Sequence, residues 1–294
     1  MLTRAQISIW AKFIACKNSK LIILFQKTLN SKLKTQNSKL IMLLSKTAQL
    51  IPIQQLSSSN WKAMYALLSS HFEGVSFAIF EQDLKQKNWA ILIEQNGILK
   101  GFSTLLIYQT KFAEETISVV YSGDTIVDPS AWSSSTLSKA WIASVRYLHQ
   151  TFAQEKLYWL LIVSGYRTYR FLPIFWQEFY PCYWIETPQQ INKLMDFLAC
   201  DRFGENYNPE TGIVRFPQPQ ILRNGLRGIP PKRLKDPHIC FFRNQNPGHL
   251  QGDELVCLTK ICEANLTSAG RRMWFADTDF FLNTRNQLLQ DPVV

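Results

Sequence analysis

Apolar and polar positions alternate through the middle of the chain in a pattern that predicts a β-sheet. Two apolar, β-prone runs at 88–95 and 98–108 flank the dipeptide Asn96-Gly97. Such a dipeptide is the strongest short-range signal for a hairpin, because both central residues of a type I′ turn need positive φ. A further apolar run at 116–127 predicts a third strand of the same sheet.

Further strands and helices are predicted on both sides of these strands in the sequence. A continuous apolar run at 157–163 predicts one more strand, which leads into an aromatic segment that stops at Pro181. The other elements expected here are a strand at 50–56, a helix from Ser59 or Asn60 to His71, a polar stretch at 82–87, a helix at 135–152 and a short helix after residue 164. Strands that alternate with helices predict an α/β sheet with helices on its faces.

The last third of the chain has weaker signals. Thr187 and Pro188 suit the start of a helix, whereas 203–237 is rich in Gly, Pro and Asn and is typical of loops. We expect a strand at 238–243 that could close the sheet, and a last helix at 253–269. This region could supply a substrate-binding element or a structural cover over the sheet.

The order strand, helix, hairpin, strand, loop, helix, strand, helix resembles the core of the acyl-CoA-dependent N-acyltransferases, the GNAT superfamily. The resemblance implies a divergent member with a mixed, mostly antiparallel central sheet and helices on both faces. It divides the chain into a basic low-complexity arm at 1–46, an acyltransferase-like core at 48–185 and a C-terminal extension at 186–294. The extension is expected to complete the sheet and to contribute to the acceptor site.

The resemblance implies acetyl-CoA or another acyl-CoA as co-substrate. In the family, backbone groups of one strand hold the pantetheine, and a Gly-rich loop with a basic residue leads into the helix whose N-terminus binds the pyrophosphate. Ile126 and Val127 match the pantetheine-binding strand. The phosphate-binding candidates are Ser133, Ser134, Ser135 and Thr136. This run lacks the glycines and the basic residue, and it could instead be a helix cap.

Amine acylation needs a base that removes a proton from an ammonium group. The resemblance places the base near Asp124, which follows Gly123, a candidate bulge. Asp124 needs a raised pKa to act at neutral pH, and the alternative is that it satisfies a backbone amide of the bulge. The family's usual tyrosine acid is absent, because Ile174 stands at its position. Tyr169 is the preferred substitute, and the alternative is a packed aromatic side chain.

The predicted function is transfer of an acyl group, acetyl or longer, to an amine of a small molecule or peptide. The alternative is a catalytically inactive member of the same fold that binds a ligand or a protein. Arg167 and Arg170, three residues apart, could contact phosphates or an acidic substrate, or form a solvated helix face. The dense aromatic residues at 158–183 would suit an apolar acyl tunnel or a packed core.

The positive charge is concentrated at the N-terminus. The net charge is +10, and ten basic residues precede the first acidic residue, Glu73, so the remaining 22 basic residues balance all 22 acidic ones. The arm could be a targeting peptide, a membrane-surface helix, a nucleic-acid arm or an unfolded extension. We favour the unfolded extension, and therefore do not expect nucleic acid as a partner.

Cysteine and histidine usage indicates a reducing compartment without a metal site. The six cysteines form no CxxC pair and the four histidines are scattered, so neither a zinc site nor a disulfide framework is indicated. The longest apolar run, 157–163, is far shorter than the roughly 20 residues that a membrane-spanning helix needs. We expect a cytoplasmic protein without a transmembrane segment, and the oligomeric state stays open.

Overall fold

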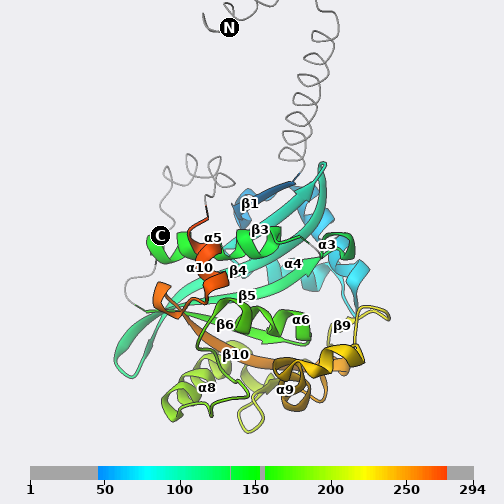
Figure 1. The fold of residues 1–294 in the computed structure, drawn as a ribbon. Coiled ribbons are helices and arrows are strands. Elements are labelled where there is room, and N and C mark those ends of the chain that lie inside the picture. The colour runs from blue at the N-terminus through cyan, green and yellow to red at the C-terminus, as the bar shows by residue number, and fades with distance from the viewer. Residues whose placement is uncertain (1–45, 133, 153–155, 277–294) are drawn as a thin grey trace, which may run out of the picture. The chain divides into compact units, whose positions relative to one another are not determined.

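The computed structural model describes residues 46–132, 134–152 and 156–276, whose arrangement is drawn in Figure 1. Only the last residue of the arm predicted at 1–46 falls within these ranges, so the prediction for the arm lies outside the described residues. The described chain contains one eight-stranded sheet and one two-stranded sheet.

The large sheet is mixed and mostly antiparallel. In spatial order its strands are β1 (Lys46–Pro52), β3 (Trp89–Gln95), β4 (Ile98–Phe112), β5 (Glu115–Val127), β6 (Leu157–Val163), β10 (Glu254–Ile261), β8 (Ile213–Val214) and β7 (Tyr207–Asn208). The small sheet pairs β2 (Phe72–Glu73) with β9 (Ile221–Leu222). The helices are α3 (Ser58–His71), α4 (Phe77–Lys85), α5 (Thr136–Phe152), α6 (Tyr166–Tyr169), α7 (Phe171–Phe175), α8 (Gln189–Phe203), α9 (Pro237–Gln245) and α10 (Ser268–Trp274).

The predicted hairpin is confirmed. β3 and β4 are antiparallel and are joined at Asn96 and Gly97, whose φ angles are 54° and 72°. These are the positive values that the turn requires, so the local sequence is sufficient to define this connection.

The predicted bulge in β5 is also confirmed. The strand pairs on either side of it are Ser103 with Thr125 and Leu105 with Ser122. Two residues of β5, Gly123 and Asp124, therefore oppose the single residue Thr104 of β4. One extra residue in a strand reverses the alternation of side chains beyond it.

β5 and β6 run parallel and then part. Their pairing begins at Ser118 with Leu157 and ends at Ser122 with Leu161. β5 continues to Val127 without a partner strand on this side in the described part of the chain, and the two arrows diverge toward their carboxyl ends in Figure 1. The parting starts at the bulge, so the backbone of β5 beyond it has an unpaired edge.

Helices cover both faces of the sheet. One face carries α5, α6, α7, α9 and α10 around a core that includes Trp141, Trp159 and Trp176. On the other face, α3 and α4 pack in one apolar cluster and α8 packs in another. β5 contributes Tyr121 to the cluster under α8 and Ile126 to the cluster under α3 and α4, so the bulge lies between two apolar regions.

Two elements of the extension are the reverse of the prediction. Residues 237–245 form α9 rather than a strand, because Asp236 caps the helix and Pro237 occupies its first position. Residues 254–261 form β10 rather than a helix, and their side chains are buried on both faces of the sheet. A strand buried on both faces loses the alternation that would identify it in a sequence.

The prediction also misses α4 and shifts the first strand. α4 is capped by the Ser76 hydroxyl and buries Phe80 and Leu84, which lie four residues apart. The first strand ends at Pro52, and the segment expected to continue it turns into a short 3-10 helix.

Candidate functional site

The bulge decides on which face Asp124 lies. Tyr121 and Ile126 are five residues apart, and side chains alternate along a strand, so a regular strand would place them on opposite faces. They share the face covered by α3, α4 and α8 because the extra residue shifts the alternation. Asp124 precedes Ile126 by two residues and therefore lies on the same face, between the two apolar clusters.

A buried lysine packs over the bulge. The Lys87 side chain has no solvent exposure, and its Nζ lies 2.6 Å from Oδ1 of Asp83 on α4. A Cβ atom at Gly123 would lie 2.6 Å from Thr104 Oγ1 and 2.7 Å from Lys87 Cε. A larger residue at this position would therefore force Thr104 or Lys87 to shift, so close packing and not the φ angle favours glycine here.

Burial raises the pKa of the Asp124 carboxyl to about 7, the nearby Asp83 charge raises it too, and the Lys87 ammonium lowers it. Part of Asp124 is still open to solvent, but the dense protein around it makes desolvation the largest cause. Burial also lowers the pKa of Lys87, an effect that Asp83 opposes. Within the described part of the chain, no hydrogen-bond donor reaches the Asp124 carboxylate. Asp124 can therefore accept a proton near neutral pH.

A second carboxyl group reaches this face from β10. Glu254 precedes Val256 by two residues, and Val256 belongs to the cluster under α8, so both lie on the face of Asp124. Burial raises the pKa of Glu254 to about 8, and the negative charge of Asp124 adds to the effect. Burial and the same acidic charges raise the pKa of Tyr121 well above its usual range. Arg202 of α8 stacks on the Tyr121 ring at 4.9 Å.

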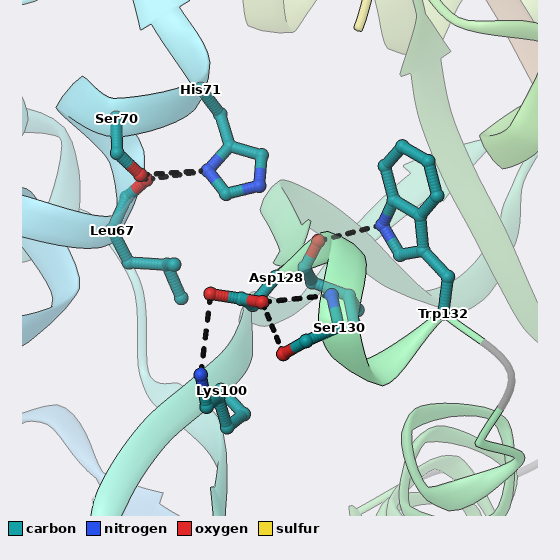
Figure 2. Close-up of polar contacts among 8 residues, drawn as sticks. Leu67, Ser70, His71, Lys100, Asp128, Ser130 and Trp132 are labelled. Carbon is teal, nitrogen blue, oxygen red and sulfur yellow. Dashed lines mark hydrogen bonds and ion pairs between the residues drawn. The ribbon is translucent and has the colours of Figure 1, made fainter.

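Polar contacts also organise the carboxyl end of β5 (Figure 2). The Asp128 carboxylate accepts a hydrogen bond from the Ser130 backbone N–H at 2.9 Å, and Lys100 Nζ lies 3.5 Å from its other oxygen. The hydrogen bonds from Ser130 lower the pKa of Asp128. Trp132 donates its indole N–H to the Val127 carbonyl at 2.8 Å, so this side chain closes over the last carbonyl of β5.

Ladder geometry distinguishes the two residues predicted to hold pantetheine. The Asp128 N–H donates to the Lys100 carbonyl at 2.8 Å. In an antiparallel ladder, hydrogen-bonded pairs alternate with pairs that point outward. The backbone groups of Ile126 therefore face β4, and those of Val127 face the space where β5 and β6 part. Of this pair, the Val127 N–H is the group open toward that space.

The Ser-rich turn forms the start of α5. The Ser134 hydroxyl accepts a hydrogen bond from the Thr136 backbone N–H at 3.2 Å and lies 2.6 Å from the Thr136 hydroxyl. The Ser135 carbonyl accepts a hydrogen bond from the Lys139 N–H at 3.0 Å. Ser134 thus caps this turn, and Ser133 lies outside the described residues. The turn begins a long helix, whose N-terminus has partial positive charge.

The two arginines of the helical segment after β6 have different surroundings. The Arg167 guanidinium lies 4.2 Å from the centre of the Trp132 ring and 4.8 Å from that of Tyr166. Its one hydrogen bond within the described chain goes to the Leu226 carbonyl at 3.3 Å. Arg170 instead lies 3.1 Å from an oxygen of Asp236 in an ion pair. Arg167 therefore keeps donors for another partner beside the opening between β5 and β6.

Tyr169 lies away from Asp124. Its side chain is fully buried in the core under α5 and α9, on the opposite face of the sheet. Its hydroxyl donates to the Pro181 carbonyl at 2.9 Å, and burial raises its pKa far above the usual range. The structure does not bring this predicted acid and the predicted base together.

Sequence reasoning missed several polar groups around the site, namely His71, Lys87, Thr104, Tyr121 and Glu254. Lys87 stands in the polar stretch at 82–87, which gave no sign that its side chain is buried. Glu254 stands in a segment predicted to be helical. A signal was available for Tyr121 only, since it precedes the predicted base by three residues in a predicted strand.

No family model matches the chain, and no curated protein matches it. Among solved structures, it is similar to a probable N-acyltransferase from Enterococcus faecalis, with 16% identity and a TM-score of 0.37 over 46% of this chain and 33% of that chain. It is also similar to Escherichia coli ElaA, with 16% identity and a TM-score of 0.32 over 49% of this chain and 95% of that chain. A third similar structure is the aminoglycoside N-acetyltransferase AAC(6′)-Iy in complex with CoA, with 13% identity and a TM-score of 0.31 over 38% of this chain and 74% of that chain.

The chain thus spans about a third of the length of the Enterococcus faecalis protein that it matches. The mixed, mostly antiparallel sheet with helices on both faces is the architecture that the sequence predicts. No helix among the described residues is long and apolar enough to cross a membrane. In the same part of the chain, no group of three or more His, Cys, Asp or Glu residues could hold a metal ion.

Proposed function

We propose that the protein is an N-acyltransferase that moves an acyl group from acyl-CoA to an amine. The observation that carries this proposal is the parting of β5 and β6 immediately after Ser122, with Asp124 beside it and a carboxyl pKa of about 7. An unpaired strand edge offers backbone hydrogen bonds to an extended substrate, and a carboxylate with such a pKa suits a general base.

Three features beside the parted strands fit an acyl-CoA substrate. The Val127 N–H faces the opening and can donate to an amide oxygen of pantetheine. Ser134 and Thr136 lie at the start of α5, where the helix dipole favours phosphate. Arg167 lies beside this turn, stacked on Trp132, and supplies the positive charge that the turn itself lacks. We therefore propose Val127, residues 133–136 and Arg167 as cofactor-binding groups. Ile126 supports Val127 because its backbone groups face β4 and hold this end of β5 in the sheet.

Asp124 is the proposed base. Its carboxylate takes a proton from the ammonium group of the acceptor, directly or through water, and leaves a neutral amine. The amine nitrogen then forms a bond to the thioester carbonyl carbon while the carbon–sulfur bond breaks. A proton leaves the nitrogen for the sulfur, and Asp124 releases its own proton to solvent. Charge and protons balance without a separate acid.

Tyr169 has a supporting role in this proposal. Its hydroxyl already donates to the Pro181 carbonyl, and its ring packs against Phe179 and Phe242. These contacts hold the segment after β6 against the core, which positions Arg167 two residues earlier on α6. The acceptor class remains an amine of a small molecule or peptide, and we propose a cytoplasmic location because the sequence has no disulfide framework.

A pair of substitutions at Ser134 tests the proposed cofactor site. An aspartate side chain also accepts a hydrogen bond from the N–H two residues on, so Ser134→Asp keeps the contact to the Thr136 N–H but adds a negative charge where phosphate would bind. Ser134→Ala removes the cap without adding charge. We expect CoA to raise the melting temperature of the wild type and of Ser134→Ala, and to leave that of Ser134→Asp unchanged. A ligand present at 100 times its Kd stabilises a protein by about 2.7 kcal/mol, which such a measurement detects easily.

Thiol release from acetyl-CoA in the presence of primary amines then tests the reaction itself. If neither CoA nor its thioesters raise the melting temperature of the wild type, the transferase proposal is wrong. The alternative is an inactive binding member of the fold. It is supported by the Trp132 indole N–H, which donates a hydrogen bond to the last carbonyl of β5. This alternative predicts that CoA stabilises the protein but that no amine causes thiol release from acetyl-CoA. The Trp132→Ala variant should then also show no thiol release.

A further inference from the structure

A buried histidine at the end of α3 has one ring nitrogen without a hydrogen-bond partner among the residues that the structure describes. His71 is 6% exposed, and its Nδ1 lies 2.8 Å from the Leu67 carbonyl oxygen and 3.0 Å from the Ser70 hydroxyl. The Nε2 atom has no hydrogen-bond partner among the described residues. Most buried polar atoms in proteins are hydrogen-bonded, so an exception of this kind points to a missing partner.

The contact to Leu67 fixes the tautomer of the neutral ring. A carbonyl oxygen can only accept a hydrogen bond, so Nδ1 must carry the proton. Nε2 then holds a lone pair and can only accept. The partner that fits His71 is therefore a hydrogen-bond donor, such as an N–H or O–H group.

His71 lies beside the proposed site. α3 contacts β5, and in Figure 2 the unpaired nitrogen of His71 is turned away from Ser70, toward the side where Asp128 lies at the end of β5. Hydrogen bonds from Ser130 lower the pKa of Asp128, so this carboxylate is charged at neutral pH. A lone pair and an anion on the same side favour a donor that is also a cation.

The extension covers this part of the site. Arg223 donates its backbone N–H to the His71 carbonyl at 2.8 Å and its side-chain Nε–H to the Ser69 carbonyl at 3.0 Å. Three residues later, the Leu226 carbonyl accepts from Arg167 on α6. The segment from 221 to 226 therefore links the end of α3 to the helix after β6.

We propose that Nε2 of His71 accepts a hydrogen bond from a protonated amino group of the acceptor, beside the charge of Asp128. The inference rests on the proposed function, because the amine is the substrate that an N-acyltransferase requires. It adds the residue that recognises the amine and the form in which the amine binds, a primary ammonium. His71 is a binding residue in this proposal, and Asp124 remains the base.

Nuclear magnetic resonance of the full-length protein without CoA tests the inference directly. Long-range proton–nitrogen spectra at pH 7.5 report the state of each histidine nitrogen. We expect butylammonium to move the Nε2 resonance of His71, and expect 1-butanol, a neutral donor, and tetramethylammonium, a cation without a donor, to leave it unchanged. His249 is the internal control, since its Nδ1 also lies 2.8 Å from a carbonyl oxygen, that of Asn246, in another part of the fold.

Two substitutions separate binding from structure. Asparagine can keep the donor to Leu67 but has no acceptor at the Nε2 position, whereas glutamine can place an oxygen there and loses the donor. With the Trp132 indole N–H resonance as the readout, we expect His71→Asn to weaken butylammonium binding about tenfold or more, the loss typical of a charged hydrogen bond. We expect His71→Gln to stay within about threefold of the wild type. A purely structural role leaves butylammonium without effect on any resonance, in the wild type and in both variants.

The inference is overturned if butylammonium leaves His71 unmoved, if 1-butanol acts as well as butylammonium, or if His249 responds equally. Failure of the proposed function is a separate result, because it appears as a wild type that CoA does not stabilise. An amine response without a CoA response would keep the His71 site and remove the transferase.

Discussion

Asp124 lies on β5 and Asp128 directly follows this strand, four residues later, but their environments have opposite effects on the carboxyl pKa. Burial raises the pKa of Asp124 to about 7, whereas hydrogen bonds from Ser130 lower that of Asp128. Asp124 lies at the bulge between two apolar clusters without a hydrogen-bond donor in the described chain. Asp128 follows the last residue of the strand, where a turn supplies donors and its side chain is 29% exposed.

A carboxylate can become a candidate base when its surroundings withhold hydrogen-bond donors from it. A carboxylate with donors is stabilised as an anion and gives up its affinity for protons. Burial raises the pKa of Asp124 and no described residue donates a hydrogen bond to it, so its affinity for a proton stays high near pH 7. Position on the strand, and not residue type, decides which aspartate can do chemistry.

The largest expected effect comes from removing the base. Under the proposed function, Asp124→Asn should lower kcat at pH 7.5 by about 10²- to 10⁴-fold, the usual contribution of a general base. The base acts when ionised, so the wild-type rate should rise as the pH increases through about 7. The residual rate of the variant should not show this rise. Initial rates between pH 5.5 and 9 measure both. A variant that keeps most of the rate and still shows the rise with pH near 7 would show that Asp124 is not the base.

The same variant tests the environment of Asp124 without any assay of activity. A carboxyl whose pKa is raised on folding favours the folded state while it is protonated, so its stabilising contribution is complete below pH 3.8 and is lost as pH rises through about 7. Asp124→Asn should therefore reduce the fall in unfolding free energy between pH 4 and 8. Glu254 acts in the same direction up to about pH 8, so part of the slope remains. Urea unfolding at several pH values measures it, and an unchanged slope would contradict the raised pKa.

A smaller effect is expected from crowding the bulge. Gly123→Ala places a Cβ against Thr104 Oγ1 and Lys87 Cε, and overpacking of this kind costs about 1–3 kcal/mol of unfolding free energy. Gly165→Ala is the matched control, because its Cβ would meet only Leu222 Cδ1 at 3.9 Å. Chemical denaturation compares the two variants, and equal stabilities would mean that the close packing over Gly123 is not needed.

The smallest effect is expected at the other aspartate. Asp128→Asn keeps a side-chain oxygen that can accept from Ser130, so the turn should lose less than about 1 kcal/mol. At saturating acceptor, kcat should stay within about twofold of the wild type, since Asp128 takes no proton in the proposed reaction, whereas the KM for the ammonium acceptor should rise because the variant removes the charge beside His71. A loss as large as that of Asp124→Asn would place the chemistry at the end of β5 instead.

Local signals predicted much of the sheet but less of the site. The Asn96-Gly97 hairpin, the bulge at Gly123 and the strand at 157–163 depend on neighbouring residues, and all three are confirmed. The segments at 238–243 and 253–269 were assigned the wrong way round, because a strand buried on both faces and a short capped helix look alike in hydrophobicity. The roles given to Tyr169 and to the Ser-rich turn stay predictions, and their surroundings were beyond the reach of sequence patterns.

By itself, the sequence determined the order of the elements, the turn at Asn96 and the extra residue that turns Asp124 to one face, since each follows from local backbone and side-chain preferences. Only the tertiary structure decided that Lys87 is buried over Gly123, that Glu254 comes from a strand 130 residues later, and that Nε2 of His71 has no hydrogen-bond partner among the described residues. The physical reason is that pKa values and unpaired atoms depend on which groups surround a side chain. Those groups come from distant parts of the chain, and their positions are set by packing.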